Sequence, residues 1–232
     1  MGMIINKVNK ILEIIIQEDL MVSVIIRNRN ESEYIGFAIQ SCIDNLEKPE
    51  IIVVDNKSSD DSLQVVNLFK DRTNIKVLHI DDYTPGKSIN LGVKHATNNR
   101  ILVLSAHSQI TNFNKIKLNS DLNRHVAVFG NQTPIYRGKK ITKRYIWSHF
   151  TDDIILNLYS DIEDRCFLHN AFCFYNKDFL IENPMPEHYP GKEDRFWAKD
   201  MVDNGYTYLY DGINYKCNHY WTTNGATWKG IG

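Results

Sequence analysis

Short runs of consecutive apolar residues recur along the first 130 residues of the chain, and polar or amphipathic stretches separate them. The runs lie at residues 22–26, 51–54, 75–78, 101–104 and 126–130. Continuous apolar runs of about four to eight residues are typical of strands buried on both faces of a sheet. Their alternation with helical stretches predicts a Rossmann-like α/β fold with a doubly wound, mostly parallel central sheet and helices on both faces.

The stretches between these runs carry apolar residues at helical spacing, which predicts helices packed on the sheet. Asn30 or Ser32 is expected to cap the first helix, and Ser59 or Asp60 the second, because short polar side chains accept hydrogen bonds from free N–H groups. A Pro-Gly turn at residues 83–87 leads into the third helix. The apolar positions are Ile35, Ala38, Ile39, Cys42, Ile43 and Leu46, then Leu63, Val66 and Phe69, then Ile89, Val93 and Ala96.

The second half of the chain is less regular. Residues 131–150 gather basic and aromatic side chains, which fits either a lid over an anionic ligand or a solvated basic loop. Residues 167–175 are strand-like, with a His-Asn pair in the middle. A Pro- and Gly-rich loop at 184–192 precedes a helix that is expected to open at Glu193 and to end at Gly205.

Residues 1–20 form a separate amphipathic pattern, with Ile4, Val8, Ile11, Leu12 and Ile15 at helical spacing. We expect a helix that packs on the body or on a second subunit, and peripheral contact with a membrane surface is the alternative. No segment has the roughly 20 uninterrupted apolar residues that a membrane-spanning helix needs.

Composition narrows the class of protein. The 232 residues are 43% hydrophobic and 24% charged, with a net charge of -1, as in an ordinary soluble globular domain. This balance argues against a nucleic-acid partner, which usually requires a strongly basic face. The four cysteines form no C-x-x-C pair and no zinc-ligand spacing, so we expect reduced thiols in a cytoplasmic protein.

Polar side chains follow the apolar runs, at the sheet edge where α/β proteins bind ligands. Asp55 follows the second run, and Ser105 and His107 follow the fourth. The dinucleotide motif G-x-G-x-x-G and the phosphate loop G-x-x-x-x-G-K-[ST] are both missing, which disfavours a dehydrogenase or an ATPase. Glu193 and Asp194 are adjacent acids that follow a loop. Either they only interact favourably with the dipole of the helix that they open, or the repulsion between the two carboxylates raises the pKa of one of them towards the range of a general base.

Five segments together resemble the family 2 glycosyltransferases of the GT-A fold, from about residue 22 to residue 219. In chain order they read VSVIIRNRNE, VVDNKSSDDS, PGKSINLGVKHA, ILVLSAHSQI and GKEDRFWAKDMVDNGY. The resemblance implies that a sugar passes from a nucleotide-sugar donor to an acceptor hydroxyl with inversion at the anomeric carbon. It also implies one domain, 21–232, with a donor-binding half (21–130) and an acceptor-binding, catalytic half (131–232).

The resemblance assigns roles to particular residues. Asp194 is expected to be the catalytic base, with Glu193 orienting it or binding the acceptor. The acceptor side is expected to include His169, Asn170 and Arg195. The donor is expected to contact Asn28, Asn30, Glu31, Asp55, Lys87, Asn90, Ser105 and His107.

One departure from the family pattern concerns the metal. Ser105-Ala106-His107 stands where the family usually has Asp-x-Asp, the motif that helps to hold Mg²⁺ or Mn²⁺ against the donor pyrophosphate. Either His107, together with His219, binds a divalent cation, Mn²⁺ more readily than Mg²⁺, or no metal is used. In the second case His107 and nearby cations stabilise the leaving diphosphate, the candidates being Lys87, Arg137, Lys192 and Arg195.

The acceptor expected from the resemblance is a glycan or a lipid-linked glycan of a bacterial surface polysaccharide, such as capsule, O-antigen or lipooligosaccharide. The enzyme would then work in the cytoplasm or at the inner face of the plasma membrane. Two other functions remain open: a non-catalytic nucleotide-sugar-binding module, and a sugar nucleotidyltransferase, which should carry a Gly-rich phosphate loop near the first strand.

Overall fold

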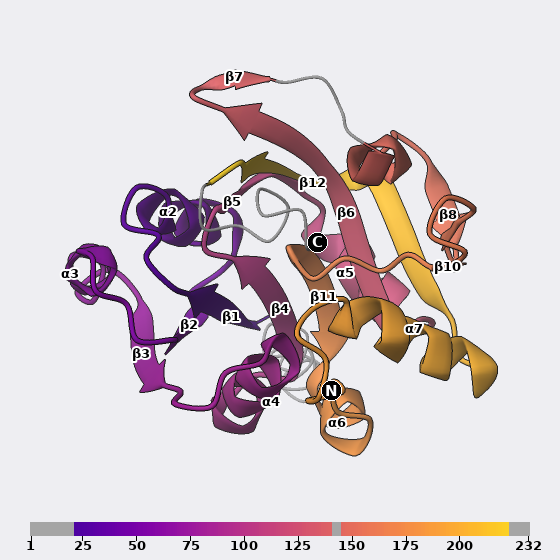
Figure 1. Cartoon of the computed structure of the whole chain (residues 1–232), viewed down its shortest axis with the longest axis horizontal. Coiled ribbons are helices and arrows are strands. Elements are labelled where there is room, and N and C mark those ends of the chain that lie inside the picture. The colour runs from indigo at the N-terminus through magenta and orange to yellow at the C-terminus, as the bar shows by residue number, and fades with distance from the viewer. Residues whose placement is uncertain (1–20, 141–144, 223–232) are drawn as a thin grey trace, which may run out of the picture.

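The computed structural model describes residues 21–140 and 145–222 as a mixed α/β fold around one large sheet (Figure 1). The helix predicted within residues 1–20 lies outside the described residues. In spatial order the main strands are β3 (Asn74–His79), β2 (Glu50–Asp55), β1 (Val22–Asn28), β4 (Arg100–Ser105), β11 (Phe172–Asn176), β6 (Ala127–Tyr136), β12 (Tyr208–Tyr220) and β5 (Ser108–Phe113).

The sheet is mostly parallel, as the apolar runs predicted. Strands β3, β2, β1 and β4 pair in parallel, and β6 pairs in parallel with β12. Strand β11 is antiparallel to both β4 and β6, and β5 is antiparallel to β12. Short strands extend the edges: β7 (Lys139–Lys140) pairs with β6, and β8 (Ile154–Leu156) pairs with β12. A separate two-stranded sheet joins β9 (Tyr159–Ser160) to β10 (Arg165–Cys166).

Helices cover both faces of the sheet because successive side chains of each buried strand point to opposite faces. In β4, Ile101 and Val103 join the apolar cluster under α4 (Pro85–His95), α6 (Lys177–Glu182) and α7 (Glu193–Asp203). Leu102 and Leu104 join the cluster under α2 (Ile35–Asn45), α3 (Ser62–Asn67) and α5 (Lys115–Leu122). The lower half of Figure 1 shows α4, α6 and α7 side by side. A short 3-10 helix, η1 (Tyr145–His149), follows β7.

The predicted cap of the first helix was wrong, because α2 starts at Ile35 after Tyr34, which makes no side-chain cap. For α3, which starts at Ser62, Asp61 makes no side-chain cap, but Asp60 Oδ1 accepts from Ser62 N (3.0 Å), as predicted for Asp60. The polar residues also tie the two preceding loops to each other. Ser59 N donates to Asn30 Oδ1 (2.7 Å), and Ser32 N donates to Asp60 Oδ2 (2.9 Å). These loops therefore form one unit beyond the ends of β1 and β2.

The strand predicted for residues 167–175 was also partly wrong. The strand β11 starts only at Phe172, and His169 and Asn170 lie in the loop before it. Hydrogen bonds to neighbouring elements hold this loop: Ser105 N donates to Ala171 O (3.1 Å), and Asn170 N donates to Asp194 Oδ2 (2.9 Å). The loop is thereby placed between the end of β4 and the start of α7.

Strand β12 contains an irregularity that shapes the far side of the sheet. Its pairing with β6 shifts between Asp211 and Lys216, where residues of β12 bulge out of register. At Gly130 of β6, an added Cβ would lie 2.3 Å from Tyr215 O. Glycine is required there because the bulge brings the two backbones into contact.

We predict that Gly130→Ala lowers the free energy of unfolding by about 2–3 kcal/mol, since the new methyl group has no space in this packed region. The measurement is urea unfolding. Gly138→Ala is the control: Gly138 has a φ of +73° and no atom within 4 Å of a built Cβ, so only backbone strain of about 1 kcal/mol is expected. Equal losses in the two variants would contradict this account of the bulge.

Candidate functional site

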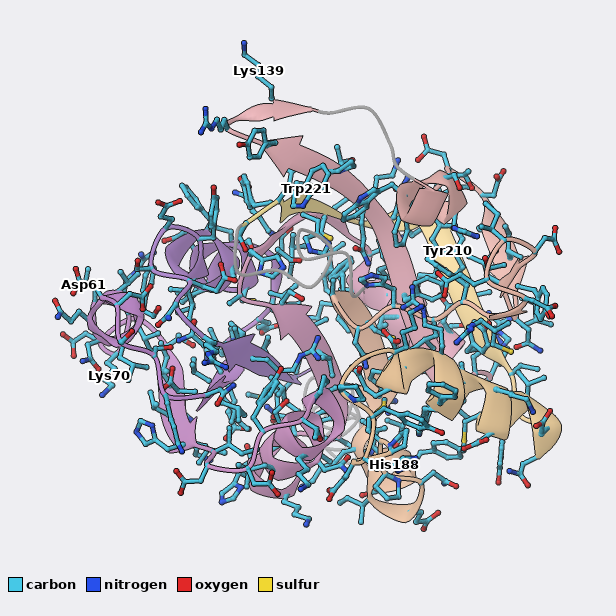
Figure 2. The ribbon with its side chains drawn as sticks, in the orientation of Figure 1. Asp61, Lys70, Lys139, His188, Tyr210 and Trp221 are labelled. Atoms are coloured by element: carbon cyan, nitrogen blue, oxygen red, sulfur yellow. The ribbon has the colours of Figure 1, made fainter. Side chains whose placement is uncertain are left out.

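Most of the residues singled out in the sequence lie at the carboxyl ends of β1, β2 and β4, in the loop before β11 and at the start of α7. The end of β12 closes the same region, since Tyr220 N donates to His107 O (2.8 Å). Trp221, labelled in Figure 2, lies just beyond β12, and its N–H donates to Ile135 O of β6 (2.7 Å). Segments that are far apart in the sequence thus form one site.

Asn28 and Asp55 are brought together at the ends of β1 and β2. Asn28 Nδ2 donates to Asp55 Oδ1 (2.9 Å) and to Ser58 Oγ (3.0 Å), while Ser58 N donates to Asp55 Oδ2 (3.1 Å). Both side chains are buried, and Asn28 Oδ1 has no hydrogen-bond partner in the described part of the chain. Asn30 joins them through its N–H to Ser58 Oγ (3.0 Å). Free acceptor capacity therefore remains for a ligand N–H or O–H.

Glu31 lies with His107 rather than with Asp55. Its Oε1 atom accepts from His107 Nδ1 (3.1 Å) and from Thr222 Oγ1 (3.2 Å). The carboxylate therefore fixes the orientation of the imidazole that follows β4.

Three histidines gather beside this pair. The rings of His107 and His219 stack with centroids 4.9 Å apart, and His169 lies 6.1 Å from His219, edge to face. His219 Nδ1 also bonds Gln132 Oε1 (2.8 Å). Burial, and then the charge of His107, lower the pKa of His219 well below 6.5, and burial followed by Arg195 does the same for His169. Ala171 N donates to His169 Nδ1 (3.2 Å), so the neutral ring carries its proton on Nε2.

The donor set does not fit a resident cation held by the protein alone. In residues 21–140 and 145–222 no group of three or more His, Cys, Asp or Glu side chains is arranged to hold a metal ion. His107 and His219 are close together, but two imidazoles are fewer ligands than the three or four that zinc sites use.

The acid pair at the start of α7 is buried and fully engaged. Asp194 Oδ2 accepts from Asn170 N (2.9 Å), and Oδ1 accepts from Arg195 N (2.9 Å) and Arg195 Nη1 (3.1 Å). Glu193 Oε1 accepts from Arg27 Nη1 (3.2 Å) and Asn170 Nδ2 (3.2 Å). Burial, and then the neighbouring Asp194 carboxylate, raise the pKa of Glu193 above 4.5. The sequence predicted that one acid of the pair has a raised pKa, and this acid is Glu193.

Three other predicted site residues are held by protein groups. Lys87, in the first turn of α4, pairs with the exposed Asp82 in the loop before the helix. Asn90 Nδ2 donates to Met185 O (2.9 Å), and Asn90 Oδ1 accepts from Met185 N (3.0 Å), so Asn90 anchors the loop before α7. Arg195 donates to Leu168 O (2.9 Å), and its guanidinium lies 4.4 Å from the centre of the Phe167 ring. These three side chains position loops around the site.

The two remaining predicted cations differ in place. Arg137 is exposed in the turn between β6 and β7, whereas Lys192 directly precedes α7 with a φ of +62°.

Sequence reasoning missed Arg27 and Gln132. Arg27 lies near the end of β1 and pairs with Glu193, 166 positions later in the chain. The only available signal was a positive charge directly after a buried run. Gln132 in β6 is 0% exposed, and nothing in the sequence around it indicated a place in the site. Its hydrogen-bond partner, His219, lies on another strand.

Comparison with known proteins identifies the family. The model described as Glycosyl transferase family 2 matches residues 23–182, more than half of the chain, so this chain belongs to glycosyltransferase family 2. The matched region includes all the residues predicted to bind the donor and ends before Glu193 and Asp194. A search of curated proteins gave no significant match.

Solved structures share the fold. The crystal structure of S. aureus TarS 1-349 in complex with UDP-GlcNAc has a TM-score of 0.65 and 21% identity, covering 88% of this chain and 60% of that one. The complex of S. aureus TarS 1-349 with UDP has a TM-score of 0.65 and 21% sequence identity, and the match covers 87% of this chain and 61% of that one. The structure of S. aureus TarS has a TM-score of 0.62 and 19% identity, and the match covers 91% of this chain and 38% of that one. The chain thus spans about three fifths or less of these proteins.

We predict that Glu193→Gln changes how stability depends on pH. A raised pKa means that folded Glu193 binds a proton that the unfolded chain has released, so its favourable contribution is present below about pH 4.5 and is lost as pH rises through the folded-state pKa. As pH rises from about 4.5 to about 7, the free energy of unfolding of the wild type should therefore fall relative to that of the variant. Urea unfolding across this range measures the difference, with the exposed Glu182→Gln as control. Parallel curves for wild type and Glu193→Gln would contradict the assignment.

Proposed function

We propose that this protein transfers a sugar from a nucleotide-sugar donor to an acceptor hydroxyl with inversion at the anomeric carbon, and that Asp194 is the general base. One observation carries the proposal: the buried Glu193-Asp194 pair is joined to the ends of β1 and β4 by hydrogen bonds through Arg27 and the loop at Asn170. Membership of glycosyltransferase family 2 supports the reaction class.

The geometry supports a division of labour within the acid pair. Asp194 is held by two backbone N–H groups and by Arg195, an arrangement that fixes one carboxylate in place. A general base must reach the acceptor hydroxyl in a defined position as that oxygen attacks the anomeric carbon. Glu193 faces Arg27 and Asn170, and it positions the loop that contacts Asp194.

A nucleoside site at Asn28, Asn30 and Asp55 is supported by their contacts with one another at the ends of β1 and β2 and by the buried Asn28 Oδ1, which has no hydrogen-bond partner in the described residues. We propose a UDP-linked sugar as the donor, because the solved structures of similar fold include complexes with UDP-GlcNAc and UDP. His169, Asn170 and Arg195 lie around Asp194, which supports an acceptor site there.

The acceptor that we propose is a glycan or lipid-linked glycan of a bacterial surface polysaccharide, reached from the cytoplasmic side of the membrane. In the described ranges no helix is long and apolar enough to cross a membrane. Contact with a lipid-linked acceptor would therefore be tested with vesicles that contain it.

We predict that UDP stabilises the purified protein in a thermal-shift screen against UDP, GDP, CMP and dTDP, each with EDTA, Mg²⁺ or Mn²⁺. A ligand at a hundredfold its dissociation constant adds about 2.7 kcal/mol to stability, which is easily measured. Stabilisation by another nucleotide would correct the donor class. The absence of any shift would overturn the proposal that this chain binds a nucleotide sugar.

We also predict that Asp194→Asn lowers kcat by about 10²–10⁴, because the amide cannot accept the proton of the acceptor hydroxyl. Sugar transfer from the donor identified in the screen measures this loss. Asp200→Asn, at an exposed position on the same helix, is the matched control and should keep the wild-type kcat. Unchanged turnover in Asp194→Asn would rule out Asp194 as the base.

A further inference from the structure

In the proposed function Arg27 only links Glu193 to the end of β1, but its place in the sheet points to a second role. It is the register partner of Ser105 in the parallel pair β1 and β4, so it lies directly beside the Ser105-Ala106-His107 segment. This segment carries no carboxylate. The positive side chain therefore stands next to the place where the sequence lacks acids for holding a cation.

The contacts of Arg27 leave part of its guanidinium available. Nη1 pairs with Glu193 Oε1 (3.2 Å), and the side chain is 17% exposed. Its Nε atom is buried and has no hydrogen-bond partner in the described part of the chain. A buried donor without a partner costs free energy, which a ligand oxygen would recover on binding.

The surroundings favour an anion over a cation. The charge of Arg27 contributes to the lowered pKa of both His169 and His219, so the three groups lie within electrostatic reach of one another. The imidazoles of His169 and His219 provide donors, and the two nearby acids are already held by protein groups: Glu193 by Arg27 and Asn170, and Glu31 by His107 and Thr222. A phosphate oxygen fits this arrangement, because guanidinium binds phosphate through paired, charge-assisted hydrogen bonds.

Two other cations near the site are already committed to protein acids. Arg195 is bound to Asp194 and to Leu168 O, and it lies 3.7 Å from Glu163. Lys87 pairs with Asp82. The Nε atoms of both Arg27 and Arg195 lack a hydrogen-bond partner in the described residues, but Arg195 Nε lies 3.7 Å from Glu163 and its guanidinium also pairs with Asp194. Among the described residues Arg27 makes one ion pair, with Glu193, and it lies in β1 beside β4.

We propose that Arg27 binds the diphosphate of the donor directly, in the role that a divalent cation has in Asp-x-Asp enzymes, so that donor binding needs no metal. This rests on the proposed function. During transfer the bond between the anomeric carbon and the diphosphate oxygen breaks, and its electron pair leaves with the nucleoside diphosphate. The acceptor oxygen forms the new bond and its proton passes to Asp194. Arg27 stabilises the charge that the diphosphate gains, and it exchanges no proton.

The test compares the affinities of UDP and uridine by calorimetry in EDTA. The ratio of the two affinities isolates the contribution of the diphosphate. We expect wild type to bind UDP much more tightly than uridine in EDTA, and added Mg²⁺ or Mn²⁺ should not increase this ratio of affinities. Because removal of Arg27 alone would leave Glu193 buried and unpaired, the main variant is the double replacement Arg27→Met with Glu193→Gln.

In the double variant the ratio should fall at least about tenfold, the value of a charge-assisted hydrogen bond, while uridine affinity stays as in wild type. Glu193→Gln alone should not lower the ratio, because it removes an acid that competes with the diphosphate for Arg27. Arg27→Lys, which keeps the charge but not the planar fork, should give an intermediate ratio. Lys199→Met, which removes an exposed positive charge from α7, should leave the ratio unchanged and so controls for net charge.

Two results would overturn the role of Arg27 while leaving the proposed function intact: a wild-type ratio near one in EDTA, or an unchanged ratio in the double variant. Loss of the ratio in Glu193→Gln alone would assign the effect to the acid and overturn it as well. Failure of wild type to bind both UDP and uridine would overturn the proposed UDP donor together with this inference.

Discussion

Two adjacent carboxylates are buried at the start of α7, and the arrangement of the site depends on how they are compensated. Burying a charge without a partner costs several kcal/mol, roughly, so each acid must receive strong donors. Glu193 and Asp194 are 3% and 5% exposed, and their donors come from three elements. Arg27 reaches them from β1, Asn170 from the loop before β11, and Arg195 from α7 itself.

This compensation joins loops from both ends of the chain. The loops after β1 and β2 are tied to each other through Asn30 and Asp60. The loop before α7 is tied to α4 through Asn90, and the loop before β11 is tied to β4 through Ser105. A ligand that contacts the end of β1 is therefore coupled to Asp194 through one ion pair and one loop. The same contacts that stabilise the buried acids fix Asp194, the base that we propose, relative to the ends of β1 and β4, where we propose that the donor binds.

The sequence predicted the core strands because continuous apolar runs have few alternatives to burial on both faces of a sheet. It also predicted α7, since acids at the start and Gly205 at the end mark a helix. Strands β5 and β12 were missed because their apolar residues alternate with polar ones and form no continuous apolar run, and because β12 contains a bulge. The cap at Asn30 failed because its side chain binds the loop after β2, whereas Asp60 binds both that neighbouring loop at Ser32 and the first N–H of its own helix at Ser62.

The site was predictable only where a residue type is tied to a local motif. Asp55, His107 and Asp194 follow from segments that can be read one at a time. The pairs Arg27 with Glu193 and Gln132 with His219 join residues 166 and 87 positions apart. Such pairs depend on the register of strands that are distant in sequence, and no local pattern carries that information.

The central claim is that one site spans the ends of β1, β2 and β4 and continues to the start of α7. A crystal structure of the protein grown with UDP in EDTA tests it most directly. The account predicts the uridine at Asn28 and Asp55, and the diphosphate within hydrogen-bond distance of the Arg27 guanidinium. A nucleotide bound elsewhere, or a diphosphate turned away from Arg27, would contradict the account.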